Sequence, residues 1–252
     1  MFEILHPSNF ISYILKPNLS YIKQRIAHDY IDIYVVDDQS PNLQLHWGPV
    51  TTDETFFQNV NTKPEIFEKH VKKYLKIYNN GSRGQFYSIF CNPTLINPQS
   101  VGDIQLQSSD PLVHPLINPQ YLTNAYDIQV LVEGCKLVNK IFSTEPLKSQ
   151  IESLITEINE CNEKEYTNEW WKYYVQSLSI TIYHPTSTCK MGPHSDETTV
   201  ITPDCRVKGV KGLRVVDASI MPKIVSGNTN IPTIALAERA SDLIKGKIIV
   251  SG

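Results

Sequence analysis

The sequence predicts an α+β fold, in which helices pack on a mostly antiparallel sheet. Segments of helical and strand-like periodicity are mixed along the 252 residues, without the regular βα alternation that indicates a parallel sheet. Hydrophobic residues make up 41% of the chain and charged residues 19%, which is typical of a globular protein. The formal net charge is -3 and no basic patch stands out, so nucleic acid is not an expected partner.

Four strands and one helix are expected in the first half of the chain. Apolar and polar side chains alternate along residues 42–47 and 101–107, and residues 31–36 and 85–91 are similarly strand-like. Apolar residues at helical spacing predict a helix over Pro64–Tyr78.

The clearest helix is expected over Asp127–Phe142. Its apolar residues recur at helical spacing and mark one buried stripe, in which Cys135 is a small core residue. Further helices are expected over residues 146–160 and 168–178, and residues 179–183 are β-prone. These helices would cover the predicted sheet.

The last forty residues predict a strand and a helix. Leu213–Asp217 is a short apolar strand that ends in a carboxylate. A helix is expected from Asn230, a suitable N-cap, to about Lys245, with Pro232 in the first turn and Gly246 as the stop. Six apolar residues of this helix are expected to pack against the domain: Ile234, Leu236, Ala237, Ala240, Leu243 and Ile244.

The five cysteines are scattered without a CxxC pair, so no disulfide framework is indicated. The first fifteen residues lack the basic leader and long apolar core of a signal peptide. No run reaches the roughly 18 apolar residues that span a membrane. The sequence therefore favours a soluble chain without indicating its compartment.

Three polar residues near the C-terminus are candidates for chemistry. Histidine can act as a base near neutral pH, because its unperturbed pKa is about 6.5. The immediate context of His184 favours a packed histidine in a turn, that of Asn228 a turn asparagine, and that of Asp217 a turn at a strand end. The residues alone leave both interpretations open.

Two other kinds of site were weighed and are not expected. His184, Cys189, His194 and Cys205 are possible zinc ligands, but they lack the paired spacing of structural zinc sites. A Cys189 nucleophile with His184 as its base is not supported by sequence spacing alone. No metal site is predicted.

Three blocks in order carry a family resemblance: YHPTSTCKMGP at 183–193, RVKGVKGLRVVDASIMP at 206–222 and SGNTNIPTIALAERASDLI at 226–244. They resemble the C-terminal part of the glucose-methanol-choline (GMC) oxidoreductases, which are FAD-dependent alcohol oxidases and dehydrogenases. Within this family, the sequences of the three motifs most resemble those of the insect glucose-dehydrogenase-like members. Residues 97–122 and 42–49 resemble the substrate domain of the same family.

The resemblance implies three segments. Residues 1–41 match poorly, residues 42–182 would form the substrate-binding domain, and residues 183–252 would carry the catalytic and FAD-contacting groups. The C-terminal strand and helix would complete a Rossmann-like FAD-binding domain in the full-length protein.

The resemblance also implies two catalytic residues. His184 would be the base for the substrate hydroxyl, while the hydride passes to flavin N5. Asn228 stands where the family has a histidine or an asparagine, and its amide would orient the substrate oxygen.

Five further residues would contact FAD. Asp217 would accept a hydrogen bond from the ribityl or pyrophosphate region, and the small Ala218 would let a backbone N–H approach phosphate. The partial positive charge at the helix N-terminus would stabilise the reduced flavin, with Thr229, Asn230 and Ile231 as neighbours.

A GxGxxG turn, which binds pyrophosphate at a helix N-terminus, is not found in the sequence. We therefore expect a C-terminal portion of an FAD-dependent oxidoreductase acting on the CH–OH groups of alcohols or sugars, with a missing N-terminal FAD-binding half as its partner. The alternative is a truncated, non-catalytic paralogue or partial gene product that acts as a binding or structural protein. The alcohol, the electron acceptor and the oligomeric state are not predicted.

Overall fold

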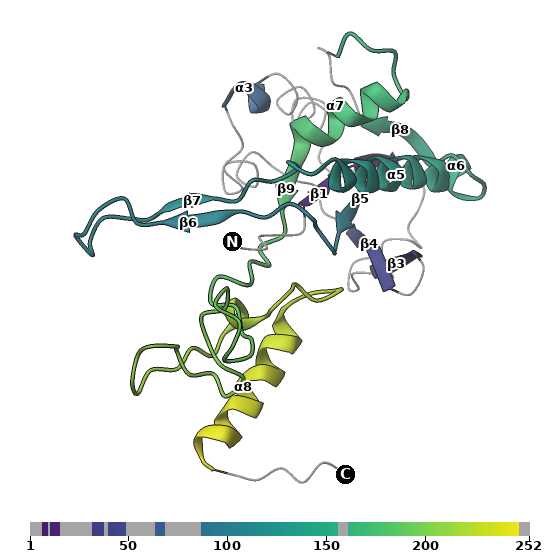
Figure 1. Ribbon diagram of the computed structural model, residues 1–252. Coiled ribbons are helices and arrows are strands. Elements are labelled where there is room, and N and C mark those ends of the chain that lie inside the picture. Colours follow the sequence, from purple (N-terminus) through teal and green to yellow (C-terminus); the bar gives the residue numbers. More distant parts are fainter. Residues whose placement is uncertain are drawn as a thin grey trace. The chain divides into compact units, whose positions relative to one another are not determined.

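The computed structural model describes residues 7–9, 11–15, 32–37, 40–48, 64–68, 87–155 and 161–246. They form an α+β fold with antiparallel sheets, which confirms the predicted class (Figure 1). The chain divides into two compact units. The sheet unit comprises Pro7–Leu95 and Ala125–Thr181, and the C-terminal unit comprises Met1–His6, Ile96–Asn124 and Ile182–Gly252.

The sheet unit contains one seven-stranded sheet in which every pair of strands is antiparallel. The central strand β5 pairs with β4 along one edge, and along the other edge with β1 and β2, which lie end to end. β3 extends the sheet beyond β4, β9 beyond β1, and β8 beyond β2. The strands are β1 (Pro7–Asn9), β2 (Ile11–Leu15), β3 (Asp32–Asp37), β4 (Ser40–Gly48), β5 (Tyr87–Leu95), β8 (Ile151–Ile155) and β9 (Ser179–Thr181).

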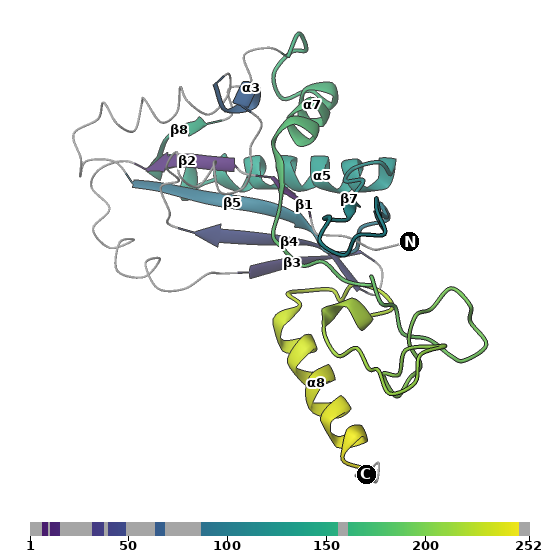
Figure 2. The same ribbon diagram turned by 90° about the vertical axis from the view of Figure 1, so that its left-hand side faces the viewer.

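Helix α5 (Ala125–Phe142) packs on this sheet along β5 and β4 (Figure 2). Its buried apolar stripe lies where the helical periodicity predicts it, and it includes the fully buried Cys135. A Cβ on Gly134 would lie 2.8 Å from the Cβ of Pro93 in β5 and 3.0 Å from a methyl group of Leu43 in β4. The helix therefore approaches the sheet closely only because residue 134 has no side chain.

Helix α7 (Asn168–Leu178) contributes an aromatic cluster to the sheet unit. The hydroxyl of Thr167 caps the helix by accepting a hydrogen bond from the N–H of Trp170 at 3.3 Å. Trp170, Trp171 and Tyr174 are almost fully buried, and the two tryptophan rings meet edge to face with centroids 4.6 Å apart. Both tryptophans are core residues.

One predicted helix of the sheet unit is wrong. Within the described residues 146–155, only a four-residue helix, α6 (Leu147–Gln150), forms before the chain enters β8. The strand pairs with β2, so sheet pairing overrides the helical preference of this segment. Residues 156–160 lie outside the described part of the chain. The helix predicted from residue 64 begins there as α3 (Pro64–Ile66), and residues 69–78 are also outside the described part.

The C-terminal unit contains a hairpin of two short strands, β6 (Asp103–Gln105) and β7 (Leu116–Asn118), drawn out as a ribbon in Figure 1. β6 is shorter than the strand predicted over residues 101–107. Apolar residues of the hairpin are exposed, and Leu106 and Leu112 are exposed most.

The rest of this unit is built around helix α8 (Asn230–Ile244) and the 3-10 turn η2 (Ala218–Ile220). A small core joins the two elements to the preceding loops: it consists of Ile201, Cys205, Ile220 and Ala240. Met191, Val207, Val215, Val216 and Leu236 pack against it.

The strand predicted over residues 213–217 is not formed. Arg214 makes an isolated antiparallel bridge with Arg206, and the N–H of Val215 bonds to the carbonyl of Cys205 at 3.1 Å. The positive φ angles of Gly209 and Gly212, both 77°, turn the intervening chain tightly. Too few consecutive ladder bonds form for a regular strand.

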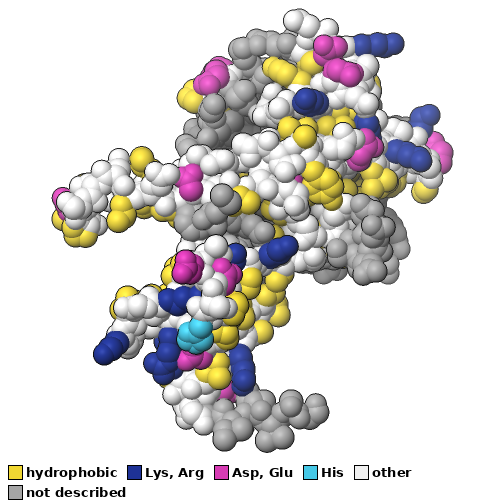
Figure 3. All heavy atoms as spheres, viewed as in Figure 1, with side chains coloured by type: hydrophobic (Ala, Val, Ile, Leu, Met, Phe, Trp, Pro, Cys, Tyr) yellow, Lys and Arg dark blue, Asp and Glu magenta, His cyan; other side chains and the backbone are white. Residues whose placement is uncertain are grey.

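Two expectations for α8 are also corrected. Thr229, not Asn230, is the N-cap residue, and Asn230 is the first residue of the helix. Of the six apolar residues expected to pack, Ala240 is buried, but Ile234 and Ile244 are 50% and 57% exposed. Figure 3 shows apolar side chains among the surface atoms of this unit. Among the described residues, no helix is both long and apolar enough to cross a membrane.

Candidate active site

His184 lies in a short stretch of unusual backbone in the C-terminal unit. Tyr183 has a φ of 62° and Ser187 a φ of 69°, both in the left-handed region that favours glycine. Such conformations are costly for residues with side chains and cluster at functional sites. The ring of His184 is half-buried between the exposed Tyr183 and the buried Thr186.

Both ring nitrogens of His184 meet residues that are far along the chain. Nε2 lies 3.2 Å from Oδ1 of Asn228, and Nδ1 lies 3.0 Å from Oγ1 of Thr229. Asn228 is exposed, whereas Thr229 is buried. The structure therefore brings together the two residues that the family resemblance implies as catalytic, and adds Thr229 to them.

The loop that carries Asn228 is fixed at both ends. Before it, the side chains of Ser226 and Asn97 exchange hydrogen bonds of 3.1 and 3.3 Å. After it, the carbonyl of Thr229 accepts the N–H of Thr233 at 3.0 Å and its hydroxyl at 2.7 Å. The amide of Asn228 is thus held between an anchored loop and the first turn of α8.

Backbone pairing connects the segment after His184 to the segment that carries Asp217 and Ala218. The N–H of Cys189 bonds to the carbonyl of Ser219 at 2.9 Å, and that of Met191 to Ile220 at 3.0 Å. Asp217 is exposed, and its Oδ1 accepts the N–H of Ser219 at 2.8 Å, so it caps the turn η2. Asp217 therefore has the role of a turn residue, which is one of the two interpretations that the sequence allows. A contact of Asp217 with FAD stays a prediction.

Asn230 and Ile231 form the first turn of α8, and both are exposed. The backbone N–H groups at this end have no partner within the helix, and they carry the positive end of its dipole. The first turn of α8 therefore presents backbone hydrogen-bond donors close in the chain to Asn228, the partner of His184.

Lys208 braces the long loop beside the site, a role that sequence reasoning missed. Its Nζ donates to the carbonyls of Pro193 at 2.8 Å and Asp196 at 2.7 Å, and to Oγ1 of Thr199 at 2.5 Å. A single lysine gives no sequence signal for such a brace, because its three acceptors include two backbone carbonyls.

Asp204 is the centre of a second brace in the same loop. Oδ1 accepts the hydroxyl of Thr202 at 2.5 Å, and Oδ2 accepts Nε of Arg206 at 2.8 Å. These hydrogen bonds, with the hydroxyl of Thr202 first, hold the pKa of Asp204 below its ordinary value of 3.8.

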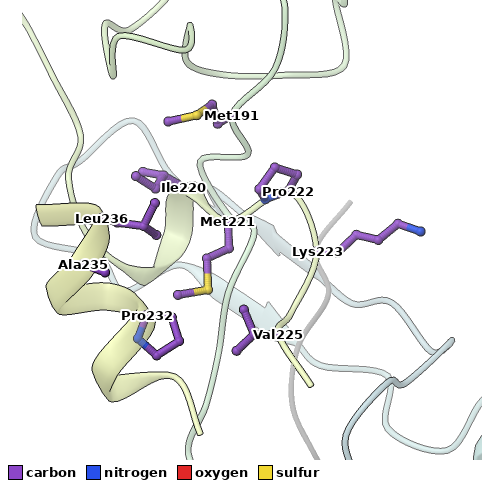
Figure 4. Close-up of a pocket in the computed structure, with 9 residues that line it drawn as sticks. All are labelled: Met191, Ile220, Met221, Pro222, Lys223, Val225, Pro232, Ala235 and Leu236. Carbon is purple, nitrogen blue, oxygen red and sulfur yellow. The ribbon is translucent and has the colours of Figure 1, made fainter. Parts of the chain in front are cut away.

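An apolar pocket of about 400 Å³ lies between α8 and the chain that leads to Asn228 (Figure 4). Lys223 points away from the other side chains around it. The lining residues are Met191, Ile220, Met221, Pro222, Lys223, Val225, Pro232, Ala235 and Leu236. Within the described ranges, no three His, Cys, Asp or Glu side chains group as metal ligands do.

The fold of this chain is similar to that of a solved structure. The structure of pyridoxine 4-oxidase from Mesorbium loti matches with a TM-score of 0.64 at 18% sequence identity, covering 98% of this chain and 44% of that one. Residues 98–237 match the family described as GMC oxidoreductase, and the chain belongs to that family. The resemblance stated from the sequence is confirmed.

Two relatives indicate the range of the family. The chain is 39% identical over 229 residues to glucose dehydrogenase [FAD, quinone] of Drosophila melanogaster, covering 90% of this chain and 33% of that protein. It is 44% identical over 149 residues to the mitochondrial choline dehydrogenase of Homo sapiens, covering 59% of this chain and 24% of that protein. The chain therefore spans no more than about a third of the length of these relatives.

Proposed function

We propose that this chain carries the catalytic pair of an FAD-dependent oxidoreductase that oxidises CH–OH groups of alcohols or sugars. The observation that carries the proposal is the 3.2 Å contact between Nε2 of His184 and Oδ1 of Asn228 in a member of the GMC family. The names of the two relatives, glucose dehydrogenase and choline dehydrogenase, support substrates that contain an alcohol group.

The exposed groups around this pair fit FAD. The first turn of α8 offers unpaired N–H donors and a positive dipole end, which suit the electron-rich edge of a flavin. The carboxylate of Asp217 is exposed and can accept a hydroxyl hydrogen bond, and Ala218 adds little bulk beside it. When bound, FAD supplies the hydride acceptor. Asp217, Ala218, Thr229, Asn230 and Ile231 are its proposed neighbours in this chain.

The protein groups handle the proton of the reaction. His184 accepts the hydroxyl proton of the substrate at Nε2, so that the ring then carries protons on both nitrogens. The Asn228 amide lies next to Nε2 and orients the substrate oxygen toward it. His184 is half-buried as a residue, and its contact with Asn228 at Nε2 is exposed.

The test is a chimera in which this chain replaces the corresponding part of the Drosophila melanogaster glucose dehydrogenase. Oxidation of a panel of alcohols and sugars is followed with a dye acceptor. His184→Gln is expected to lower kcat by about 10² to 10⁴-fold, the range for removal of a general base, with the flavin spectrum retained. His194→Gln, the same change at an exposed histidine, is the matched control.

Unchanged kcat in His184→Gln would contradict the assignment of the base. A colourless and inactive chimera would instead favour the alternative, a binding or structural protein that does not hold FAD.

A further inference from the structure

Thr229 stands at the N-cap of α8 but does not cap it. An N-cap threonine usually accepts a hydrogen bond from the N–H of the second or third helical residue. The third residue here is Pro232, which has no N–H. Thr229 also has helical backbone angles, φ −84° and ψ −8°, in place of the usual extended ones, and its side chain makes no cap bond. Its hydroxyl is therefore available to another partner.

That partner is the ring of His184, whose Nδ1 lies 3.0 Å from Oγ1 of Thr229. Thr229 is only 7% exposed, so bulk water competes little for this bond. The backbone of Thr229 is also tied into α8, because its carbonyl accepts the backbone N–H of Thr233 at 3.0 Å. A rigid hydroxyl thus faces the nitrogen of His184 that points away from Asn228.

We propose that Thr229 is a positioning residue that sets the orientation of the His184 ring and the placement of its protons. The proposal rests on the proposed role of His184 as the base. It adds to that role a residue that need not touch the substrate, because it acts through Nδ1.

The chemistry of the two partners of the ring explains why a hydroxyl is suited to this place. Oδ1 of Asn228 can only accept, so the neutral ring form that pairs with it is the one that carries its proton on Nε2 and accepts from Thr229 at Nδ1. A base needs the opposite arrangement, with a lone pair on Nε2 and the proton on Nδ1. The hydroxyl of Thr229 can donate or accept, so it pairs with Nδ1 in both arrangements.

The same bond remains after proton transfer. The O–H bond of the substrate breaks, an N–H bond forms at Nε2, and the ring then has two N–H groups. Thr229 accepts a hydrogen bond from the Nδ1–H of this charged ring, and hydrogen bonds to charged groups are stronger than neutral ones. Without the hydroxyl, this N–H would lack its acceptor at Thr229.

The test observes the ring directly, in the full 252-residue chain labelled with ¹⁵N-histidine. The resonances of His184 are identified by their loss in His184→Gln. At a pH at which both ring nitrogens carry protons, the exchange of the Nδ1 proton with water is measured by NMR. Slow exchange is expected in the wild type and in Thr229→Ser, and exchange at least about tenfold faster in Thr229→Val.

Thr233→Val is the matched control, because it makes the same chemical change one helical turn away and leaves the bond between Thr229 and His184 in place. It is expected to exchange like the wild type. Resonances of the other histidines that stay unchanged in Thr229→Val show that the fold is retained.

Fast exchange in the wild type, slow exchange in Thr229→Val, or equal acceleration in Thr233→Val would each overturn the proposal. The proposal would also be overturned if Thr229→Ser accelerated the exchange of the Nδ1 proton as much as Thr229→Val. These outcomes do not depend on activity, so they are distinct from a failure of the base role of His184, which the chimera reports.

Discussion

His184 and Asn228, 44 positions apart in the chain, meet with 3.2 Å between Nε2 and Oδ1. The histidine is half-buried and the asparagine exposed, so the amide proposed to orient the substrate is open to solvent. The two side chains are already adjacent, and adjacency of this kind reduces the entropy that the proposed reaction must lose in bringing them together.

Removal of the Asn228 amide is expected to affect turnover more than folding. In the chimera, Asn228→Ala should lower kcat by about 10²-fold, the loss typical of a misplaced reacting group. Asn228→His should retain more activity than Asn228→Ala, since an imidazole N–H can also hydrogen-bond the substrate oxygen. Asn162→Ala, at an exposed asparagine of the sheet unit, controls for the substitution itself. Equal activity in Asn228→Ala and Asn162→Ala would contradict the orienting role.

Loss of the Lys208 ammonium should destabilise the loop that it braces. Lys208→Met removes three hydrogen bonds to Pro193, Asp196 and Thr199. The expected loss in the free energy of unfolding is about 1–2 kcal/mol, at the low end for charged donors because the lysine is half-buried. Urea denaturation measures it, with Lys211→Met at an exposed lysine as the control. A similar small change in both variants would show that the brace contributes nothing.

A methyl group at position 134 should separate α5 from the sheet. Gly134→Ala improves helix propensity by up to about 1 kcal/mol, but its Cβ would lie 2.8 Å from Pro93 and 3.0 Å from Leu43. Overpacking of this kind costs about 1–3 kcal/mol, so a net destabilisation is expected in urea denaturation. Lys140→Ala, at an exposed position of α5, should stay within about 0.5 kcal/mol of the wild type. A more stable Gly134→Ala variant would mean that the helix can move away freely.

The carboxylate of Asp204 should make the C-terminal unit sensitive to acid. The hydroxyl of Thr202 and then the guanidinium of Arg206 hold its pKa below the ordinary 3.8, so the folded state favours the charged form. Its stabilisation is present above pH 3.8 and is lost as the pH falls through the lower folded value. Asp204→Asn should therefore be less stable than the wild type at about pH 6, by less than a fully buried pair would give, and the difference should shrink below about pH 3.8.

Unfolding of both proteins at several pH values checks this expectation. Thr202→Val, which removes the first cause of the lowered pKa, should show part of the same effect. A difference between wild type and Asp204→Asn that is constant from pH 6 to pH 3 would contradict it.

The helices with strong periodicity were predictable because one face of each is buried. The apolar stripe of α5 and the limits of α7 agree with the structure for that reason. The segment that became β8 was not predictable, since its conformation follows from pairing with β2, a strand far along the chain. The strand expected at 213–217 is absent for a different reason. Its residues are strand-like, but they pair with the neighbouring chain only through an isolated bridge at Arg214.

The sequence predicts which residues belong to the candidate site, but it does not predict which of their atoms make contact. His184 and Asn228 stand in motifs, whereas the bond between His184 and Thr229 depends on a backbone conformation at residue 229 that no local pattern specifies. One signal was present in the sequence: Pro232 stands three residues after Thr229, where the usual donor to a capping hydroxyl would be. That spacing removes one of the two usual N–H donors to the hydroxyl of Thr229.

Pro232 thus connects the stability of a helix to the order of a candidate active site. An ordinary residue at this position would offer a second N–H donor to the hydroxyl of Thr229, and a cap bond of this kind is worth about 1 kcal/mol. With proline, the first turn of α8 forgoes that bond and the hydroxyl remains with the ring. Pro232 therefore withholds one donor that would compete with His184 for the hydroxyl of Thr229.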